Sequence, residues 1–310
     1  MELSLLLMSK LFSMTLWSIV GFVLVKIGIL RASDSGVLSK LTLYALVPSM
    51  LLRIFQIELT PERLRGLGAS MLFAVIVHLI WIGGTYLLAK PLKLTIVDRA
   101  TLIYTNCGNL LLPLITMILD DEHAFYAIGF MSVFNVLIWL HGVPLIRGDQ
   151  KPEFLKGLLN PNVIALTISF VLALSGFRFP GIIDTSLKGL ADMVGPCSML
   201  VIGMVIANAS LKDVFTSRKT YLITFGRLIV LPVLTMLLLW ASRIVALRPE
   251  FREVFLISML AVSAPPAAMV SQLAAIYDKD AESAGLYNIM GVLFCIITIP
   301  MMIALYQFMF

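Results

Sequence analysis

Residues 105–113 read Thr-Asn-Cys-Gly-Asn-Leu-Leu-Leu-Pro, a polar and flexible cluster inside an otherwise apolar stretch. Proline cannot donate a hydrogen bond to the carbonyl four residues earlier, so Pro113 predicts an interrupted helix. A second apolar stretch is interrupted in the same way by residues 263–266, Ser-Ala-Pro-Pro. In lipid, unsatisfied backbone groups are costly, so such breaks persist only where protein or water satisfies them. The two stretches predict a membrane protein with an internal site between two interrupted helices.

The composition supports the membrane class. Of the 310 residues, 60% are hydrophobic and 13% are charged, with a mean hydropathy of +0.99, whereas soluble proteins carry about 25% charged residues. A bilayer-spanning helix needs about 20 apolar residues. A window of this length, moved along the sequence, predicts an all-α integral membrane protein of ten transmembrane helices. The predicted spans are residues 11–30, 37–57, 67–89, 100–119, 124–146, 159–177, 185–207, 219–241, 252–276 and 284–306.

The charge distribution predicts orientation and excludes several classes of function. Thirteen Lys and Arg residues lie in loops after the odd-numbered spans and nine lie on the opposite face, so we expect both termini outside the cytoplasm of a cell (inner) membrane. Arg227 lies within a span, where it either snorkels to the interface or attracts an anion. Without a basic stripe we expect no nucleic-acid partner, and without ligand or nucleophile spacing we expect no cofactor, no metal and no enzyme.

An internal repeat divides the chain into residues 1–150 and 151–310. A shift of 148 residues places Gly28 on Gly176 and Pro48 on Pro196. A shift of 156 places the first break over the second. Each half contains five spans, and because five is odd, the second half is expected to enter the membrane from the opposite side. Inverted repeats with interrupted helices are typical of secondary transporters, whose substrates bind near the midplane.

The breaks supply most candidate binding residues. Amide hydrogens at the start of a half-helix bind carboxylates, whereas freed carbonyls favour a cation or a hydroxyl; the alternative is a proline kink used only for packing. The candidates for substrate binding are Asn106, Cys107, Gly108, Asn109, Pro113, Ser263, Pro265 and Pro266, with Tyr44 and Ser49 of the second span. Candidates for coupling or gating are the intramembrane polar residues Asp192, Asn135, Asn288 and Gln272.

These residues also carry a family resemblance. Leu38-Ser39-Lys40-Leu41 with Pro48, Asn106 seven residues before Pro113, and Pro265-Pro266 followed by Tyr277 and Asp280 resemble the auxin efflux carrier family, which includes bacterial carriers of malonate or malate. The resemblance implies ten helices in two inverted repeats, with spans 4 and 9 crossing at the substrate site. It also implies elevator-type displacement and a homodimer. Leu111, Ala268 and Met269 depart from the family pattern.

The sequence therefore predicts a secondary active transporter that moves a small organic anion, a mono- or dicarboxylate or an auxin-like acid, by alternating access at the breaks. A coupling proton or sodium ion is compatible with this prediction. Two alternatives remain open: a sodium or proton antiporter or symporter of the bile-acid-symporter type, and a membrane sensor without transport.

Overall fold

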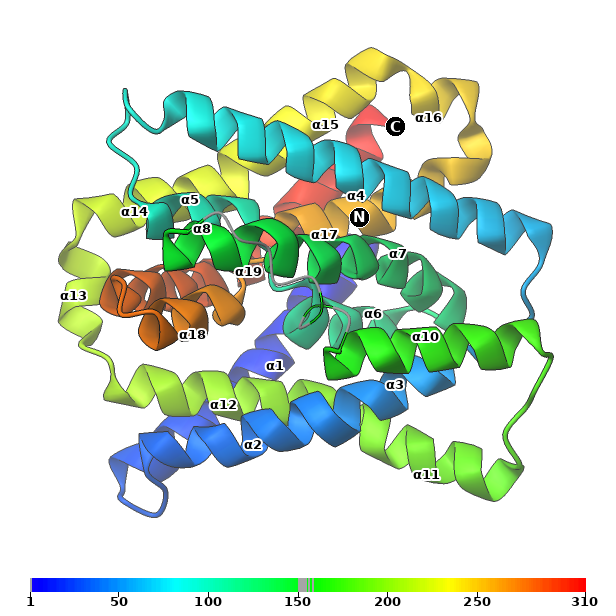
Figure 1. Cartoon of the computed structure of the whole chain (residues 1–310), viewed down its shortest axis with the longest axis horizontal. Coiled ribbons are helices and arrows are strands. Elements are labelled where there is room, and N and C mark those ends of the chain that lie inside the picture. Colours follow the sequence, from blue (N-terminus) through cyan, green and yellow to red (C-terminus); the bar gives the residue numbers. More distant parts are fainter. Residues whose placement is uncertain (1, 150–154, 156, 158) are drawn as a thin grey trace.

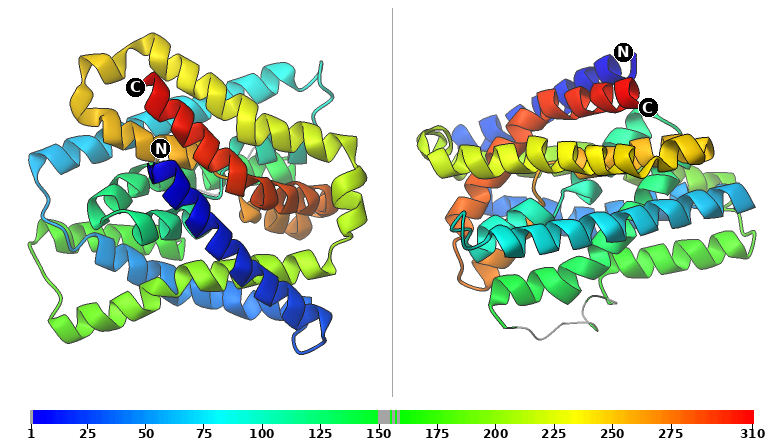
Figure 2. Two further views of the ribbon diagram at one scale, coloured as in Figure 1. Left: turned by 180° about the vertical axis from the view of Figure 1, so that it is seen from behind. Right: turned by 90° about the horizontal axis from the view of Figure 1, so that it is seen from above.

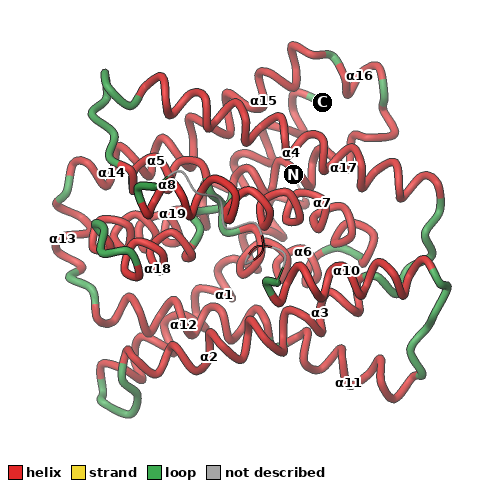
Figure 3. Tube along the Cα trace, in the orientation of Figure 1, coloured by secondary structure: helices red, strands yellow, loops and turns green. Residues whose placement is uncertain are grey.

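The computed structural model describes residues 2–149, 155, 157 and 159–310, and over them the chain is built from helices and loops (Figure 3). The predicted boundary between residues 150 and 151 lies outside the described residues. Within the described residues, seven helical segments are long and apolar enough to cross a membrane. They are Leu3–Lys26, Ala32–Ile54, Pro61–Leu88, Asp121–Arg147, Gly181–Asn208, Arg218–Ser242 and Ala281–Met309.

The other three predicted spans are short or interrupted. The sixth is α10, Pro161–Leu174, with 14 residues. The fourth and ninth are pairs of half-helices, so the count of ten crossings stays a prediction. The predicted ends of several spans were wrong: the first helix, α1, occupies Glu2–Lys26 rather than 11–30, and the seventh span begins at Gly181 rather than 185. At the start of α1, Glu2, Ser9 and Lys10 lowered the apolar average that set the predicted limit, whereas the apolar residues 27–30 carried the predicted end beyond Lys26.

The helices form two groups, one in the lower part of Figure 1 and the other across its middle and upper part. The small bundle packs the first two spans against the sixth and seventh. Besides α1 and α10, it contains η1 (Ala32–Asp34), α2 (Ser35–Leu41), η2 (Thr42–Leu46), α3 (Val47–Ile54), α11 (Gly181–Asp192) and α12 (Val194–Asn208).

The large bundle contains the remaining helices. Its elements from the first half are α4 (Pro61–Leu88), α5 (Ile96–Ile103), η3 (Cys107–Leu111), α6 (Leu112–Ile118), α7 (Asp121–Leu137), η4 (Ile138–Gly142) and α8 (Val143–Arg147). Those from the second half are α13 (Leu211–Thr216), α14 (Arg218–Phe225), η5 (Gly226–Val230), α15 (Leu231–Ser242), α16 (Ile244–Leu247), η6 (Pro249–Phe251), α17 (Arg252–Ser263), α18 (Ala268–Ile276) and α19 (Ala281–Met309). The two bundles meet where α1 packs against α19, which brings the chain termini close together (Figure 2).

Four prolines inside the spans are accommodated by widened turns. Each lies two residues after a five-residue π-helical turn, namely η2, η3, η4 or η5, and these prolines are Pro48, Pro113, Pro144 and Pro232. In each case the residue just before the proline donates its N–H to the carbonyl five residues back. The wider turn carries the helix past the position where proline lacks a donor.

Two glycines matched by the repeat share one conformation. Gly28 (φ +79°) and Gly176 (φ +72°) both adopt the left-handed region after the ends of α1 and α10. The residue after each glycine donates to a carbonyl five residues back, that of Leu24 in one case and Leu172 in the other. Glycine ends a helix in this way because it lacks a Cβ. The sequence match therefore corresponds to a structural one, and its inverted sense stays a prediction.

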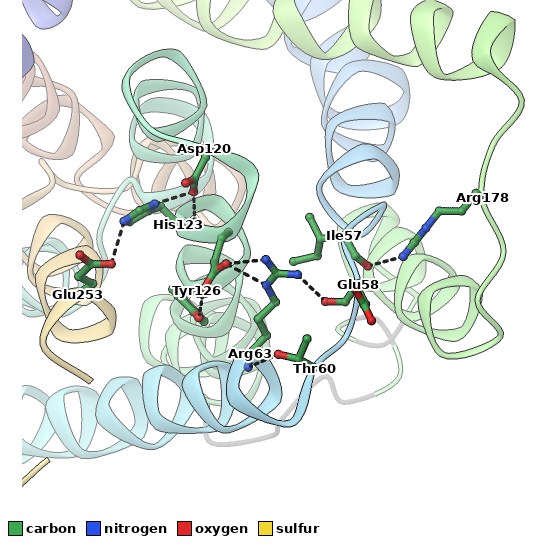
Figure 4. Close-up of polar contacts among 10 residues, drawn as sticks. Ile57, Glu58, Thr60, Arg63, Asp120, His123, Tyr126, Arg178 and Glu253 are labelled. Carbon is green, nitrogen blue, oxygen red and sulfur yellow. Dashed lines mark hydrogen bonds and ion pairs between the residues drawn. The ribbon is translucent and has the colours of Figure 1, made fainter. Parts of the chain in front are cut away.

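Ion pairs tie the helix ends together on the face where α6 ends and α7 begins (Figure 4). Arg63 of α4 bonds Glu122 of α7 through Nη2 at 2.7 Å and Nε at 2.9 Å. His123 lies between Asp120, at 2.6 Å, and Glu253 of α17, at 3.5 Å. Burial alone raises the pKa of Asp120, but hydrogen bonds from the side chain and backbone of His123 outweigh it, so the pKa is lowered. These contacts join elements of the large bundle.

Candidate functional site

The two interrupted helices break into extended backbone. α5 ends at Ile103, and the chain then runs extended before η3 begins at Cys107. α17 ends at Ser263, and residues 264–267 separate it from α18. The second break coincides with the predicted one. The first lies at Tyr104–Asn106, before the glycine and proline on which the prediction rested, because η3 carries the chain past Pro113 within a helix.

The two breaks cross and pair with each other. Thr105 forms an antiparallel bridge with Pro266. The backbone N–H of Asn106 donates to the Pro265 carbonyl at 2.8 Å, and that of Ala267 donates to the Tyr104 carbonyl at 3.0 Å. Each break thus satisfies part of the backbone that the other exposes, as a bilayer interior requires. We call residues 104–107 and 263–267 the crossing.

Several buried side chains at the crossing have polar atoms without a partner. Thr105, Asn106 and Ser263 are buried, with 4% exposure or less. The Oγ1 of Thr105, the Nδ2 of Asn106 and the Oγ of Ser263 make no hydrogen bond to any described residue. Most buried polar atoms in folded proteins are satisfied, so each exception calls for an explanation.

Arg227 of η5 also lies at the crossing and is completely buried. Its Nη2 donates to the carbonyls of Val262, at 2.9 Å, and Ala264, at 3.0 Å. Its guanidinium carbon lies 4.6 Å from the centre of the Trp81 ring of α4. The Nε and Nη1 atoms have no partner among the described residues. Arg227 does not snorkel to the interface; it caps the end of α17.

The other predicted residues differ in their relation to the crossing. Asn288 of α19 contacts it directly, because its Nδ2 donates to the Pro266 carbonyl at 2.8 Å. Cys107 is buried in the first turn of η3, and Gly108 is half-buried facing Met131. Asn109, two residues after Cys107, is exposed. A cavity of about 20 Å³ lies between the bundles next to Leu110, room for about one water molecule.

Several candidates make no described contact with the crossing. Tyr44 is 67% exposed, and Ser49 donates to the Ala45 carbonyl of its own helical segment. Asp192 ends α11, twelve residues into its span, and pairs with Lys188 at 2.7 Å. Gln272 is exposed on α18. Asn135 of α7 is buried, and its Nδ2 has no described partner.

Sequence reasoning singled out Arg227 within a span but did not place it among the site residues, and it missed a buried ion pair. Asp98 of α5 is fully buried, and its Oδ2 lies 2.7 Å from the Nζ of Lys219 on α14. The Tyr287 hydroxyl of α19 donates to Asp98 Oδ1 at 2.8 Å. This group joins the half-helix α5 to α14 and α19. The available signal was one Arg within an apolar stretch and one Asp at the margin of another, and neither indicates its partner.

One comparison with known proteins identifies a family for this chain. The family model described as "membrane transport protein" matches the chain over residues 6–155 and 150–303. A search of curated proteins finds no match.

Proposed function

Because the chain belongs to the membrane transport protein family, that of the auxin efflux carriers, and is a membrane transporter, we propose that its cargo is a small organic anion that binds at the crossing. The cargo class is a mono- or dicarboxylate, and transport is secondary active, by alternating access as the large bundle moves against the small one. The observation that carries the proposal is the set of buried hydrogen-bond donors without partners at the crossing.

The polar atoms at the crossing that lack a hydrogen-bond partner favour an anion over a cation as the cargo. A cation needs oxygen ligands that face it, but five carbonyl oxygens of the breaks already accept hydrogen bonds. They belong to Tyr104, Val262, Ala264, Pro265 and Pro266. The unpartnered atoms are instead two guanidinium nitrogens, an amide nitrogen and two hydroxyls, all able to donate. A carboxylate accepts from such donors, and charge-assisted hydrogen bonds of this kind are the strong ones.

The electrostatics of the crossing favour the same cargo. The first turn of α18 begins at the crossing without a side-chain cap, so its positive end faces this region. Arg227 adds a full positive charge, and among the described residues no carboxylate pairs with it. The sodium or proton antiporter alternative calls for free acidic groups there. The predicted candidate Asp192 is exposed and paired with Lys188, and the buried Asp98 of α5, six residues before the crossing, is paired with Lys219.

Uptake measurements in proteoliposomes test the proposal. Labelled malonate, malate and indole-3-acetate are supplied with and without a pH or sodium gradient, and at least one is expected to show saturable uptake. Asn106→Ala removes a donor to the charged cargo and is expected to lower uptake efficiency about tenfold or more. The matched control, Asn208→Ala, changes an exposed asparagine at the end of α12 and is expected to leave uptake unchanged.

Two results would contradict this proposal. Unaltered saturable uptake in Asn106→Ala would place the cargo elsewhere. Transport of sodium or protons without any carboxylate would exclude an anion carrier in favour of the antiporter alternative.

A further inference from the structure

Arg227 is a buried charge without a counter-charge among the described residues. Its side chain has 0% exposure, and its described contacts are two carbonyl oxygens and one aromatic ring. Cys107 and His78 lie within electrostatic range, and neither is a carboxylate. Buried charges in proteins are paired almost without exception, and ionisable residues inside membranes usually mark substrate pathways.

The contacts that Arg227 makes also fix its position. Both hydrogens of Nη2 are used by the end of α17, and the guanidinium plane lies near the indole ring of Trp81, so the side chain is held from two helices. This leaves the N–H groups of Nε and Nη1 free. All of these anchors belong to the large bundle, as do both strands of the crossing. Any displacement of the large bundle as a unit therefore carries the charge of Arg227 with it.

We propose that Arg227 is the counter-charge of the transported carboxylate, so that cargo binding removes the net charge of the crossing. This rests on the proposed function and specifies the electrical state of each step. The empty crossing carries one positive charge. The crossing loaded with a monocarboxylate is neutral, and the crossing loaded with a dicarboxylate carries one negative charge.

The charge count predicts which step responds to the membrane potential. Exchange of external for internal cargo uses only the loaded crossing, whereas net uptake also requires the empty crossing to return. Exchange of a monocarboxylate is therefore independent of potential, and net uptake of the same compound depends on it. One elementary charge that crosses a full 59 mV changes an equilibrium about tenfold, so a change of several-fold in net uptake is expected. Exchange of a dicarboxylate depends on potential.

The experiment compares exchange and net uptake in proteoliposomes at set potassium diffusion potentials, with indole-3-acetate and malonate as probes. Arg227→Gln removes the positive charge of the crossing. The crossing loaded with indole-3-acetate then carries one negative charge, so exchange of this probe becomes potential-dependent. Binding of either probe, followed as ligand-induced thermal stabilisation, weakens about 100-fold. Arg227→Lys keeps the charge, so exchange of indole-3-acetate stays independent of potential. The matched control is Arg218→Gln, which removes an exposed arginine from the start of α14, the helix that leads into η5.

Three results would overturn this inference. One is exchange of indole-3-acetate in the wild-type protein that depends on potential as strongly as net uptake does. Another is exchange of malonate that is independent of potential. The third is an Arg227→Gln protein that binds and exchanges either probe as the wild type does. If Arg227→Gln does not fold, the wild-type and Arg227→Lys measurements still decide. Any of these results in a protein that transports carboxylates leaves the proposed function intact, whereas failure to transport any carboxylate contradicts both proposals.

Discussion

Replacing Gly291 with alanine is expected to lower saturable carboxylate uptake about 100-fold, although the substitution adds only one methyl group. Gly291 lies in α19, and a Cβ there would overlap the Cδ of Pro266 and press on Pro265. Pro266 forms the bridge to Thr105, and its carbonyl is held by Asn288, three residues before Gly291. The added methyl group therefore displaces one strand of the crossing. Misplacement of binding groups by about 1 Å is enough for a loss of this size.

The measurement is uptake per amount of folded protein, with folding verified by size-exclusion chromatography in detergent. Gly285→Ala is the matched control, because Gly285 belongs to the same helix and a Cβ there would meet no atom within 4 Å. It is expected to transport normally. Normal transport by Gly291→Ala would mean that the position of Pro266 does not matter for the cargo.

Gly203→Ala is expected to destabilise the whole protein by about 3 kcal/mol, the upper range for overpacking. Gly203 of α12 lies against α1, and a Cβ there would overlap the carbonyl oxygen of Ser18. In the opposite direction, a Cβ at Gly21 of α1 would overlap the carbonyl oxygen of Leu200. Both obstacles are backbone atoms, which cannot rotate away, so the two helices must separate. Small residues at such contacts allow membrane helices to approach closely.

The control for this stability prediction lies in the same predicted span. A Cβ at Gly189 of α11 would meet no atom within 4 Å. Alanine at this position is expected to stabilise the helix by about 1 kcal/mol relative to glycine. In detergent, the midpoint temperature of thermal unfolding is expected to fall for Gly203→Ala. For Gly189→Ala it is expected to stay the same or rise. Equal midpoints for the two variants would show that the contact between α1 and α12 tolerates added volume.

The prolines show which helix interruptions can be predicted from neighbouring residues alone and which cannot. Pro265 and Pro266 predicted an interruption, and the chain is extended at these residues because two consecutive prolines leave no donors for a helix. Pro113 predicted the same, yet it follows a π turn and the chain remains helical around it. Both outcomes are compatible with a proline in an apolar stretch. Which one occurs depends on the partner segment, and Tyr104–Asn106 is extended because it pairs with residues 265–267.

The asparagines and the aspartate show the same limit at the level of single side chains. Asn106 and Asn109 are three residues apart and were equivalent as candidates, but one is buried in the crossing and the other is exposed. Asp192 was the clearest carboxylate within a span, yet it pairs with Lys188 on its own helix. Burial depends on which neighbouring helix covers a face, and the residues of that neighbour are distant in sequence.

The sequence by itself determined the membrane class, the family, the two interrupted helices and the equivalence of Gly28 with Gly176. These properties follow from hydrophobicity, proline chemistry and glycine conformation, which act within a few residues. Only the tertiary structure decided that the breaks pair with each other and that Arg227 is buried beside them. Arg227 lies 35 residues from Val262, the first carbonyl it binds. The physical reason is that the location of a charge in a membrane protein depends on which distant backbone groups satisfy it.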